Sequence, residues 1–128
     1  MTIPSGRPRQ IIVVEDDGLI AMHLEETLES RGFEVPELFA SGEEVIAYLG
    51  HMPPPDLILM DIRLDGKMNG LEAAQWIRER FTLPIIFISG NVDKELIPPF
   101  GTLRNSLTKP FSREDLFAII DEALLQYS

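Results

Sequence analysis

Four polar sites in this sequence each follow a run that could form a buried strand, and together they could bind a phosphate group. They are the acidic cluster Glu15-Asp16-Asp17 after Ile11–Val14, Asp61 after Leu57–Met60, Ser89 after Ile85–Ile88, and Lys109 after Ser106–Thr108. In an open parallel sheet the carboxyl ends of the strands lie side by side and form the ligand crevice. We therefore expect carboxylates, a hydroxyl and an ammonium group, distant in sequence, to meet at one edge of a sheet.

The residue types at this edge favour phosphate chemistry that depends on a metal ion. Three carboxylates, those of Glu15, Asp16 and Asp61, would repel one another there. A hard divalent cation relieves the repulsion, and Mg²⁺ binds one or two carboxylates together with waters and phosphate oxygens. Such a site suits phosphoryl transfer, with a carboxylate as nucleophile that forms an aspartyl-phosphate. Ser89 and Lys109 could then hold the phosphoryl oxygens by hydrogen bond and by charge.

The same residues also have simpler interpretations. An Asp at the end of a strand commonly begins a loop. Acidic residues at a helix N-terminus interact favourably with the helix dipole, which would account for Glu15-Asp16-Asp17. Ser89-Gly90 is a common turn pair, and Lys109-Pro110 alone carries little information. The coincidence of all four at the ends of successive strand-like runs favours a functional site.

The alternation of strand and helix patterns predicts an α/β domain, with a parallel sheet between two layers of helices. Strands are expected at Gln10–Val14, Phe33–Phe39, Asp56–Met60, Pro84–Ile88 and Ser106–Thr108. Helices are expected at Gly18–Arg31, from the cap Ser41 to Leu49, at Gly70–Arg80, and from Ser112 to about Gln126. Pro36 places the second strand at an edge of the sheet. Between Asp93 and Asn105, the pair Pro98-Pro99 predicts one or two helical turns with an irregular remainder.

Apolar spacing predicts which sides of the helices face the core. In the first helix Ile20, Leu24 and Leu28 recur every four residues along one face. In the last helix apolar residues lie on more than one side, so Phe117 and Leu125 are expected to point outward. There they could form a homodimer or partner surface.

Composition excludes several classes of protein. The chain has 128 residues, 45% of them hydrophobic, which suits one domain, expected at residues 9–128 after a mobile lead-in at 1–8. The net charge of −10 argues against direct nucleic-acid binding, which depends largely on Lys and Arg. The absence of cysteine excludes disulfides and zinc–thiolate sites. No apolar run reaches the length of a membrane span, and the basic start lacks the core of a signal peptide, so we expect a cytoplasmic protein.

From about Arg9 to Tyr127 the chain resembles the receiver domain of two-component response regulators. The motifs that carry the resemblance are Ile12-Val13-Val14-Glu15-Asp16-Asp17, Leu57-Ile58-Leu59-Met60-Asp61, Gly70-Leu71-Glu72-Ala73-Ala74, Pro84-Ile85-Ile86-Phe87-Ile88-Ser89-Gly90 and Lys109-Pro110-Phe111. The resemblance implies a doubly wound, five-stranded parallel sheet with the flavodoxin-like strand order 2-1-3-4-5, an order already known for such folds.

The resemblance also implies roles for residues on the two central strands. Asp61 matches the phospho-acceptor, which takes a phosphoryl group from a histidine kinase or a phosphotransfer protein. Asp16 matches the direct metal ligand and Glu15 its water-mediated partner, while Arg63 would supply a backbone carbonyl. The implied metal is Mg²⁺ or Mn²⁺.

Ser89 matches the Thr or Ser that follows the phosphoryl group in this family, and Lys109 matches the lysine that contacts it. The Lys109–Pro110 bond matches one that is often cis. Such a domain promotes its own phosphorylation and slow dephosphorylation. We therefore expect a switch that changes an interaction with a downstream protein, not a turnover enzyme.

Two departures from the family pattern concern the output of the switch. Ser106 stands where many receivers have Tyr or Phe, three residues before the lysine. The loop from Leu64 to Gly70 lacks the common Pro and looks one residue longer. We expect phosphorylation to be retained and still to move Ser89-Gly90. Because Ser106 replaces the aromatic residue and Pro98-Pro99 breaks the crossover, we expect the signal to pass through Asp93–Asn105 and not through an aromatic switch.

Three other functions fit parts of the sequence. A phosphorylation-independent pseudo-receiver would act as an adaptor, but the carboxylates, Ser89 and Lys109 are all present. The best-known Mg²⁺-dependent phosphatases with an Asp nucleophile have a second acid where Arg63 stands. A flavin-binding fold of similar topology needs a Ser/Thr/Gly-rich phosphate loop, whereas Glu15-Asp16-Asp17 would repel phosphate.

Overall fold

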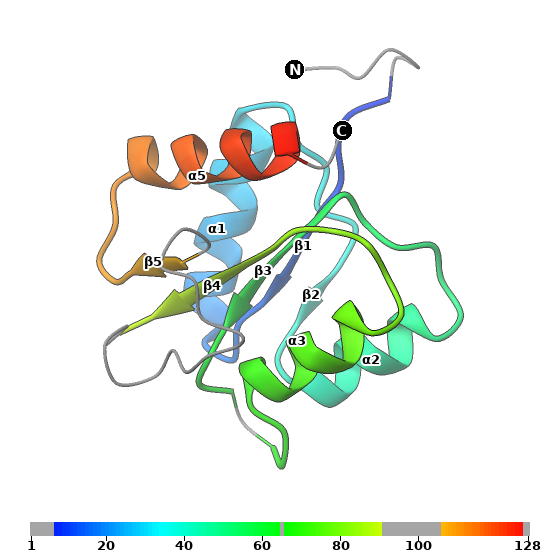
Figure 1. The fold of residues 1–128 in the computed structure, drawn as a ribbon. Coiled ribbons are helices and arrows are strands. Elements are labelled where there is room, and N and C mark those ends of the chain that lie inside the picture. The colour runs from blue at the N-terminus through cyan, green and yellow to red at the C-terminus, as the bar shows by residue number, and fades with distance from the viewer. Residues whose placement is uncertain (1–6, 65, 91–105, 127–128) are drawn as a thin grey trace.

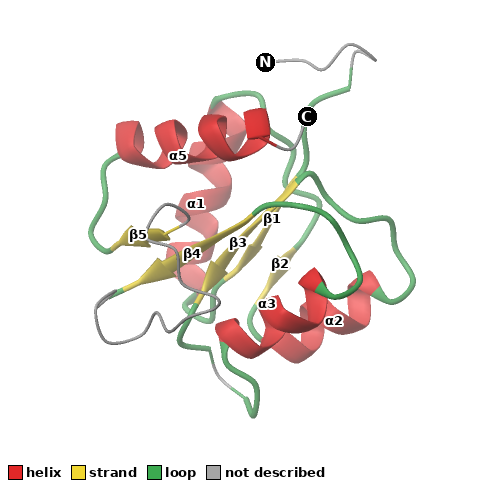
Figure 2. Cartoon of the chain, viewed as in Figure 1, coloured by secondary structure: helices red, strands yellow, loops and turns green. Residues whose placement is uncertain are grey.

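The structure is a computed structural model that describes residues 7–64, 66–90 and 106–126. Its elements are β1 (Ile11–Val14), α1 (Gly18–Ser30), β2 (Leu38–Phe39), α2 (Gly42–Leu49), β3 (Leu57–Asp61), α3 (Gly70–Arg78), β4 (Ile85–Ser89), β5 (Ser106–Thr108) and α5 (Arg113–Gln126). The strands form one parallel sheet in the order β2-β1-β3-β4-β5, which confirms the predicted fold class and strand order. Helices α1 and α5 cover one face, and α2 and α3 cover the other (Figures 1 and 2).

The three central strands are buried on both faces because successive side chains point to opposite sides of the sheet. Ile11, Val13, Leu57, Leu59, Ile86 and Ile88 pack with residues of α1 and α5. Ile12, Val14, Ile58, Met60, Ile85 and Phe87 pack with residues of α2 and α3. The unbroken apolar runs in the sequence therefore correspond to strands enclosed between two helical layers.

The strand predicted at Phe33–Phe39 is much shorter in the structure. Only Leu38 and Phe39 pair with β1, and Glu34 forms an isolated bridge with Gln10. Pro36 lies between these two pairings and has no N–H to donate, which interrupts the ladder there.

The central strands β3 and β4 each begin and end one residue later than predicted. Asp61 and Ser89 are therefore the last paired residues of their strands, opposite Ile88 and Thr108 respectively. Both polar side chains are fixed by the sheet and not by the loops that follow it.

The helices also correct several predicted positions. Helix α1 ends at Ser30 and α3 at Arg78, short of the predicted Arg31 and Arg80. Ile20 was expected in the core but is 37% exposed, and Ala21 is buried in its place beside Leu24 and Leu28.

The prediction that Phe117 points outward is wrong. Its side chain is 3% exposed and stacks on Phe33 with ring centroids 6.2 Å apart, while the guanidinium of Arg31 lies 4.4 Å from its ring centre. Leu125 is 77% exposed, as predicted. Of the two residues expected to form a dimer surface on α5, only Leu125 is therefore exposed.

The expected output segment Asp93–Asn105 lies outside the described residues. Within the described part of the chain, no helix has the length and apolar character needed to cross a membrane.

Candidate functional site

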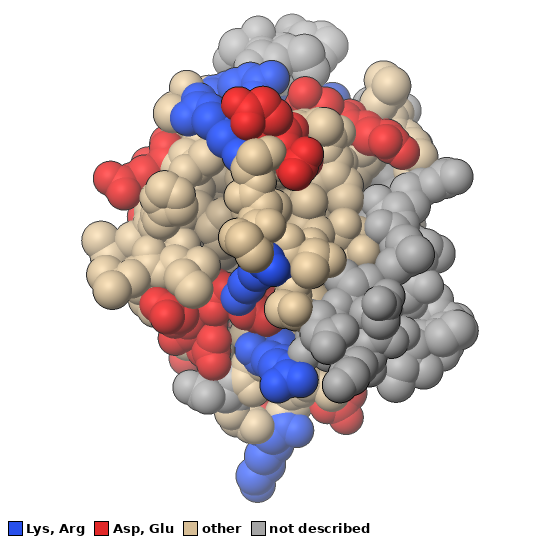
Figure 3. All heavy atoms as spheres, turned by 90° about the vertical axis from the view of Figure 1, so that its left-hand side faces the viewer, with Lys and Arg blue, Asp and Glu red and all other residues tan. Residues whose placement is uncertain are grey.

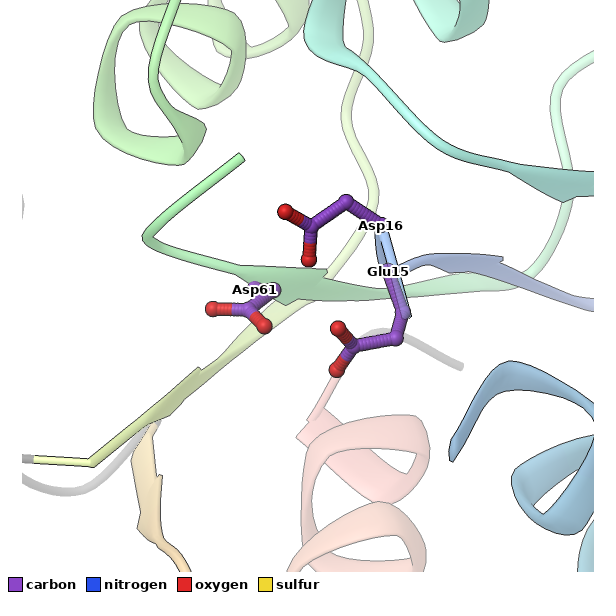
Figure 4. Close-up of side chains that lie close together, drawn as sticks. All are labelled: Glu15, Asp16 and Asp61. Carbon is purple, nitrogen blue, oxygen red and sulfur yellow. The ribbon is translucent and has the colours of Figure 1, made fainter. Parts of the chain in front are cut away.

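Three carboxylates converge where β1 and β3 end. Glu15 directly follows β1, and Asp61 is the last residue of β3. One carboxylate oxygen from each of Glu15, Asp16 and Asp61 lies within 4.8 Å of the others (Figure 4). Glu15 is 4% exposed and Asp61 is 5% exposed, and Asp16 is the more accessible of the three. The three acidic residues therefore lie close together, as predicted.

The ammonium group of Lys109 lies between two of these carboxylates. Its Nζ is 3.2 Å from Glu15 Oε1 and 3.0 Å from Asp61 Oδ2. The backbone N–H of Lys109 donates to the carbonyl of Ser89 at 2.8 Å, so the residue is tied to the end of β4 as well. The Lys109–Pro110 bond is cis, as expected.

Burial and mutual repulsion change how these groups bind protons. Burial raises the pKa of Glu15 to about 7, and the nearby Asp61 adds to the rise, against hydrogen bonds from the Asp17 backbone and from Lys109. Burial alone would lower the pKa of Lys109, but its hydrogen bond and charge interaction with Asp61, and then with Glu15, raise it above the usual value. The lysine therefore stays charged and compensates part of the acidic cluster.

The backbone around the cluster satisfies several carboxylate oxygens. The N–H of Arg63 donates to Asp61 Oδ1 at 3.0 Å, and the N–H of Asp17 donates to Glu15 Oε2 at 3.1 Å. Asp17 itself caps α1, because its Oδ1 accepts from the N–H groups of Leu19 and Ile20 at 3.0 and 3.2 Å. Helix capping thus accounts for Asp17, while Glu15 and Asp16 remain in the cluster.

The carboxylates open into a cleft of about 530 Å³. It is lined by Glu15, Asp16, Asp17, Ile20, Asp61, Arg63, Gly90 and Lys109. Figure 3 looks onto this side of the molecule and shows acidic and basic atoms close together near its middle. Ser89 does not line the cleft; it is 1% exposed at the end of β4. The structure thus brings together every predicted site residue except the Ser89 side chain, which is buried beside the site.

A second, more apolar groove adjoins the cleft. It has a volume of about 460 Å³ and lies between α1 and the start of α5, lined by Ile20, His23, Leu24, Thr27, Ile88, Lys109, Pro110, Phe111, Ser112, Arg113 and Leu116. Ile20 and Lys109 line both hollows, so a partner seated in the groove would lie next to the carboxylates.

Sequence reasoning placed the start of this helix at Gly70, which is the first residue of α3, but it missed why glycine is needed there. A Cβ atom there would overlap the carbonyl oxygen of Asp61, so only glycine allows α3 to begin so close to the acidic strand end. Asn69 caps the same helix in a capping box with Glu72. The Asn-x-x-Glu spacing was a readable signal for that cap.

The oxygen-rich cluster fits a hard divalent cation. Carboxylate oxygens suit Mg²⁺ or Mn²⁺, and no described His lines the acidic cleft. Two of the carboxylates are buried, and a single lysine is shared between them. A cation would offset the remaining negative charge.

Comparison with known proteins identifies related chains. A family model for the response regulator receiver domain matches residues 11–121. The transcriptional regulatory protein PdtaR of Mycobacterium tuberculosis is 30% identical over 123 residues, which cover 94% of this chain and 58% of PdtaR. The phyllosphere-induced regulator PhyR of Methylorubrum extorquens is 31% identical over 115 residues, or 90% of this chain and 43% of PhyR. The chain thus spans about half the length of these relatives.

Among solved structures, a similar fold occurs in the receiver domain of a sensor histidine kinase from Pseudomonas aeruginosa. The two structures superpose with a TM-score of 0.80 at 30% identity, over 91% of this chain and 98% of the other. That structure holds a magnesium ion coordinated in its active-site cleft.

Proposed function

The chain belongs to the response regulator receiver domain family, and on this premise we propose that it accepts a phosphoryl group on Asp61 from a histidine kinase or a phosphotransfer protein. The observation that carries the proposal is the arrangement around Asp61, a nearly buried carboxylate beside Glu15, Asp16 and Lys109 at the mouth of an open cleft. Receiver domains are signalling domains as a family, so phosphorylation is expected to change an interaction with a partner protein.

The cluster would hold Mg²⁺ or Mn²⁺ through Asp16, Asp61 and the backbone carbonyl of Arg63, with Glu15 acting through water. When bound, the cation neutralises negative charge on the phosphoryl group. The magnesium ion in the similar receiver domain from Pseudomonas aeruginosa supports this assignment.

The chain's own residues position the acceptor and hold the product. The N–H of Arg63 fixes Asp61 Oδ1, and Lys109 lies at Oδ2. In the transfer, the bond between phosphorus and the donor nitrogen breaks as a bond between phosphorus and a carboxylate oxygen of Asp61 forms. Lys109 then pairs with a phosphoryl oxygen, and the hydroxyl of Ser89 turns to donate a hydrogen bond to another.

The phosphodonor would dock over α1 and the start of α5. The apolar groove there shares Ile20 and Lys109 with the acidic cleft, and Leu19 and Met22 add exposed apolar surface on α1 at 80% and 55% exposure. A helix seated in the groove could bring a phosphohistidine to Asp61.

Intact-mass measurement after incubation with acetyl phosphate tests the proposal. The wild type should gain one phosphoryl group only when Mg²⁺ is present, and Asp61→Asn should gain none. Asp121→Asn, a change at an exposed carboxylate that pairs with Arg31 and does not line the cleft, should behave as the wild type does. If the wild type shows no gain although circular dichroism reports an intact fold, a phosphorylation-independent adaptor becomes the better function.

A further inference from the structure

The loop between β3 and α3 begins and ends against the acidic strand end. The N–H of Ile62 donates to the carbonyl of Ile88 at 3.1 Å, and the N–H of Gly70 donates to the carbonyl of Ile62 at 2.8 Å. Arg63, whose N–H holds Asp61 Oδ1, lies inside this loop. The loop is therefore held to β4 at its start, and its end is held to its start through Ile62. A further contact holds the loop at Lys67.

That contact comes from the first turn of α2. Glu43 Oε2 accepts a hydrogen bond from the N–H of Lys67 at 3.0 Å. The adjoining Gly66 has a φ of +100°, and a Cβ there would lie 3.0 Å from Glu43 Oε1. The loop backbone thus lies directly against the carboxylate, in a conformation that favours glycine.

Apolar contacts close the same junction. Gly42 is buried, and a Cβ at this position would lie 3.0 Å from Ala73 Cβ and 3.3 Å from Met68 Cγ. Met68 packs against the core between the sheet and helices α2 and α3. The first turn of α2 therefore contacts both the loop and α3.

From these contacts we propose that Glu43 is a positioning residue, which fixes the β3–α3 loop and so sets the affinity of the acidic cleft for a divalent cation. The inference rests on the proposed function, because it assumes that the Arg63 carbonyl in this loop is a metal ligand. Glu43 contributes through its hydrogen bond to the loop backbone, and it does not line the cleft.

A Mn²⁺ binding measurement tests the proposal, with the electron paramagnetic resonance signal used to quantify the free ion. Glu43→Ala should weaken binding about threefold to tenfold, the loss expected for one hydrogen bond. Glu43→Gln should recover most of the affinity, because the amide oxygen can accept the same hydrogen bond. Glu44→Ala should bind as the wild type does. It removes the same charge from the same turn, but Glu44 accepts from the N–H of Ala40 and not from the loop.

Hydrogen exchange provides a second measurement, independent of the metal. The amide protons of Lys67 and Arg63 should exchange faster in Glu43→Ala than in Glu44→Ala. If Glu43→Ala binds Mn²⁺ as tightly as the wild type does, the positioning role of Glu43 is overturned, but the proposed metal site is not. Equal weakening in Glu43→Ala and Glu43→Gln would also overturn it, because charge would then be the cause. Failure of the wild type to bind Mn²⁺ would instead overturn the metal site of the proposed function.

Discussion

Lys109 Nζ lies 3.0 Å from Asp61 Oδ2, although the two residues are 48 positions apart in the chain. The same nitrogen contacts Glu15 Oε1 at 3.2 Å, so one cation compensates two carboxylates that are almost fully buried. The charge balance of the candidate site therefore depends on a residue that directly follows β5, even though both acids lie where the central strands β1 and β3 end.

Lys109→Met should destabilise the metal-free protein by about 2 kcal/mol, because it leaves two buried carboxylates without their shared partner. The loss is smaller than for a fully buried pair because the Lys109 side chain is 31% exposed. The loss should be smaller in saturating Mg²⁺, since the cation replaces the missing charge. Urea unfolding with EDTA and with Mg²⁺ measures both values. Lys67→Met, which removes the charge of an exposed side chain, is the control. An equal loss with and without Mg²⁺ would mean that Lys109 stabilises the fold by packing.

Metal-free stability should fall as the pH rises from about 5 to about 8. The pKa of Glu15 is raised from 4.5 to about 7 in the folded protein, chiefly by burial. The folded state then binds the proton more tightly than the unfolded state. The proton on Glu15 therefore stabilises the folded state fully below the unfolded pKa, and this stabilisation is lost as the pH rises through the folded pKa. The free energy of unfolding should fall by roughly 2 to 3 kcal/mol. Unfolding in EDTA across this range measures the slope, and Glu15→Gln should flatten it. A slope that is identical in Glu15→Gln would assign the effect to other groups.

The position of the candidate site could be predicted from the sequence because its residues lie at the ends of strands. Apolar runs marked the central strands, and parallel pairing brings their carboxyl ends together, so Glu15, Asp16, Asp61 and Lys109 were predictable. The structure adds that Asp17 caps α1, which begins at Gly18 as predicted.

Other features depend on contacts that no local pattern contains. Phe117 is buried because Phe33 and Arg31, which follow α1, pack against it. Gly70 and Glu43 act on backbone atoms brought near by the fold, so spacing alone did not reveal them. β2 is short because Pro36 has no N–H to continue the pairing, although the edge position of that strand was correctly expected.

Phe117→Ala should destabilise the protein by about 3 to 4 kcal/mol, the usual loss for a large aromatic side chain removed from a core. Leu125→Ala on the same helix should change stability by less than about 0.5 kcal/mol, because that side chain is 77% exposed. Thermal or chemical unfolding of the two variants measures the difference. Equal losses would show that α5 is covered at Leu125, for example by a second copy of the chain.

Gly70→Ala should cost at least about 3 kcal/mol or prevent folding, since the new methyl group would meet the Asp61 carbonyl oxygen and the Cα of Ile62. Gly18→Ala is the matched control at the start of α1. A Cβ there would have no neighbour within 4 Å, so stability should be unchanged or rise by less than about 1 kcal/mol. Circular dichroism and urea unfolding distinguish the two variants, and tolerance of Gly70→Ala would contradict the close approach of α3 to the strand end.

The enclosure of β1, β3 and β4 between two helical layers also limits how the chain can change in length. Inserting or deleting one residue within these strands would send every following side chain to the opposite layer, and an entire apolar set would have to fit a differently shaped core. Insertions and deletions are therefore tolerable only beyond the strand ends. The loop after Asp61 is such a place, because it lies beyond the end of β3 and a change in its length leaves the alternation inside the sheet intact.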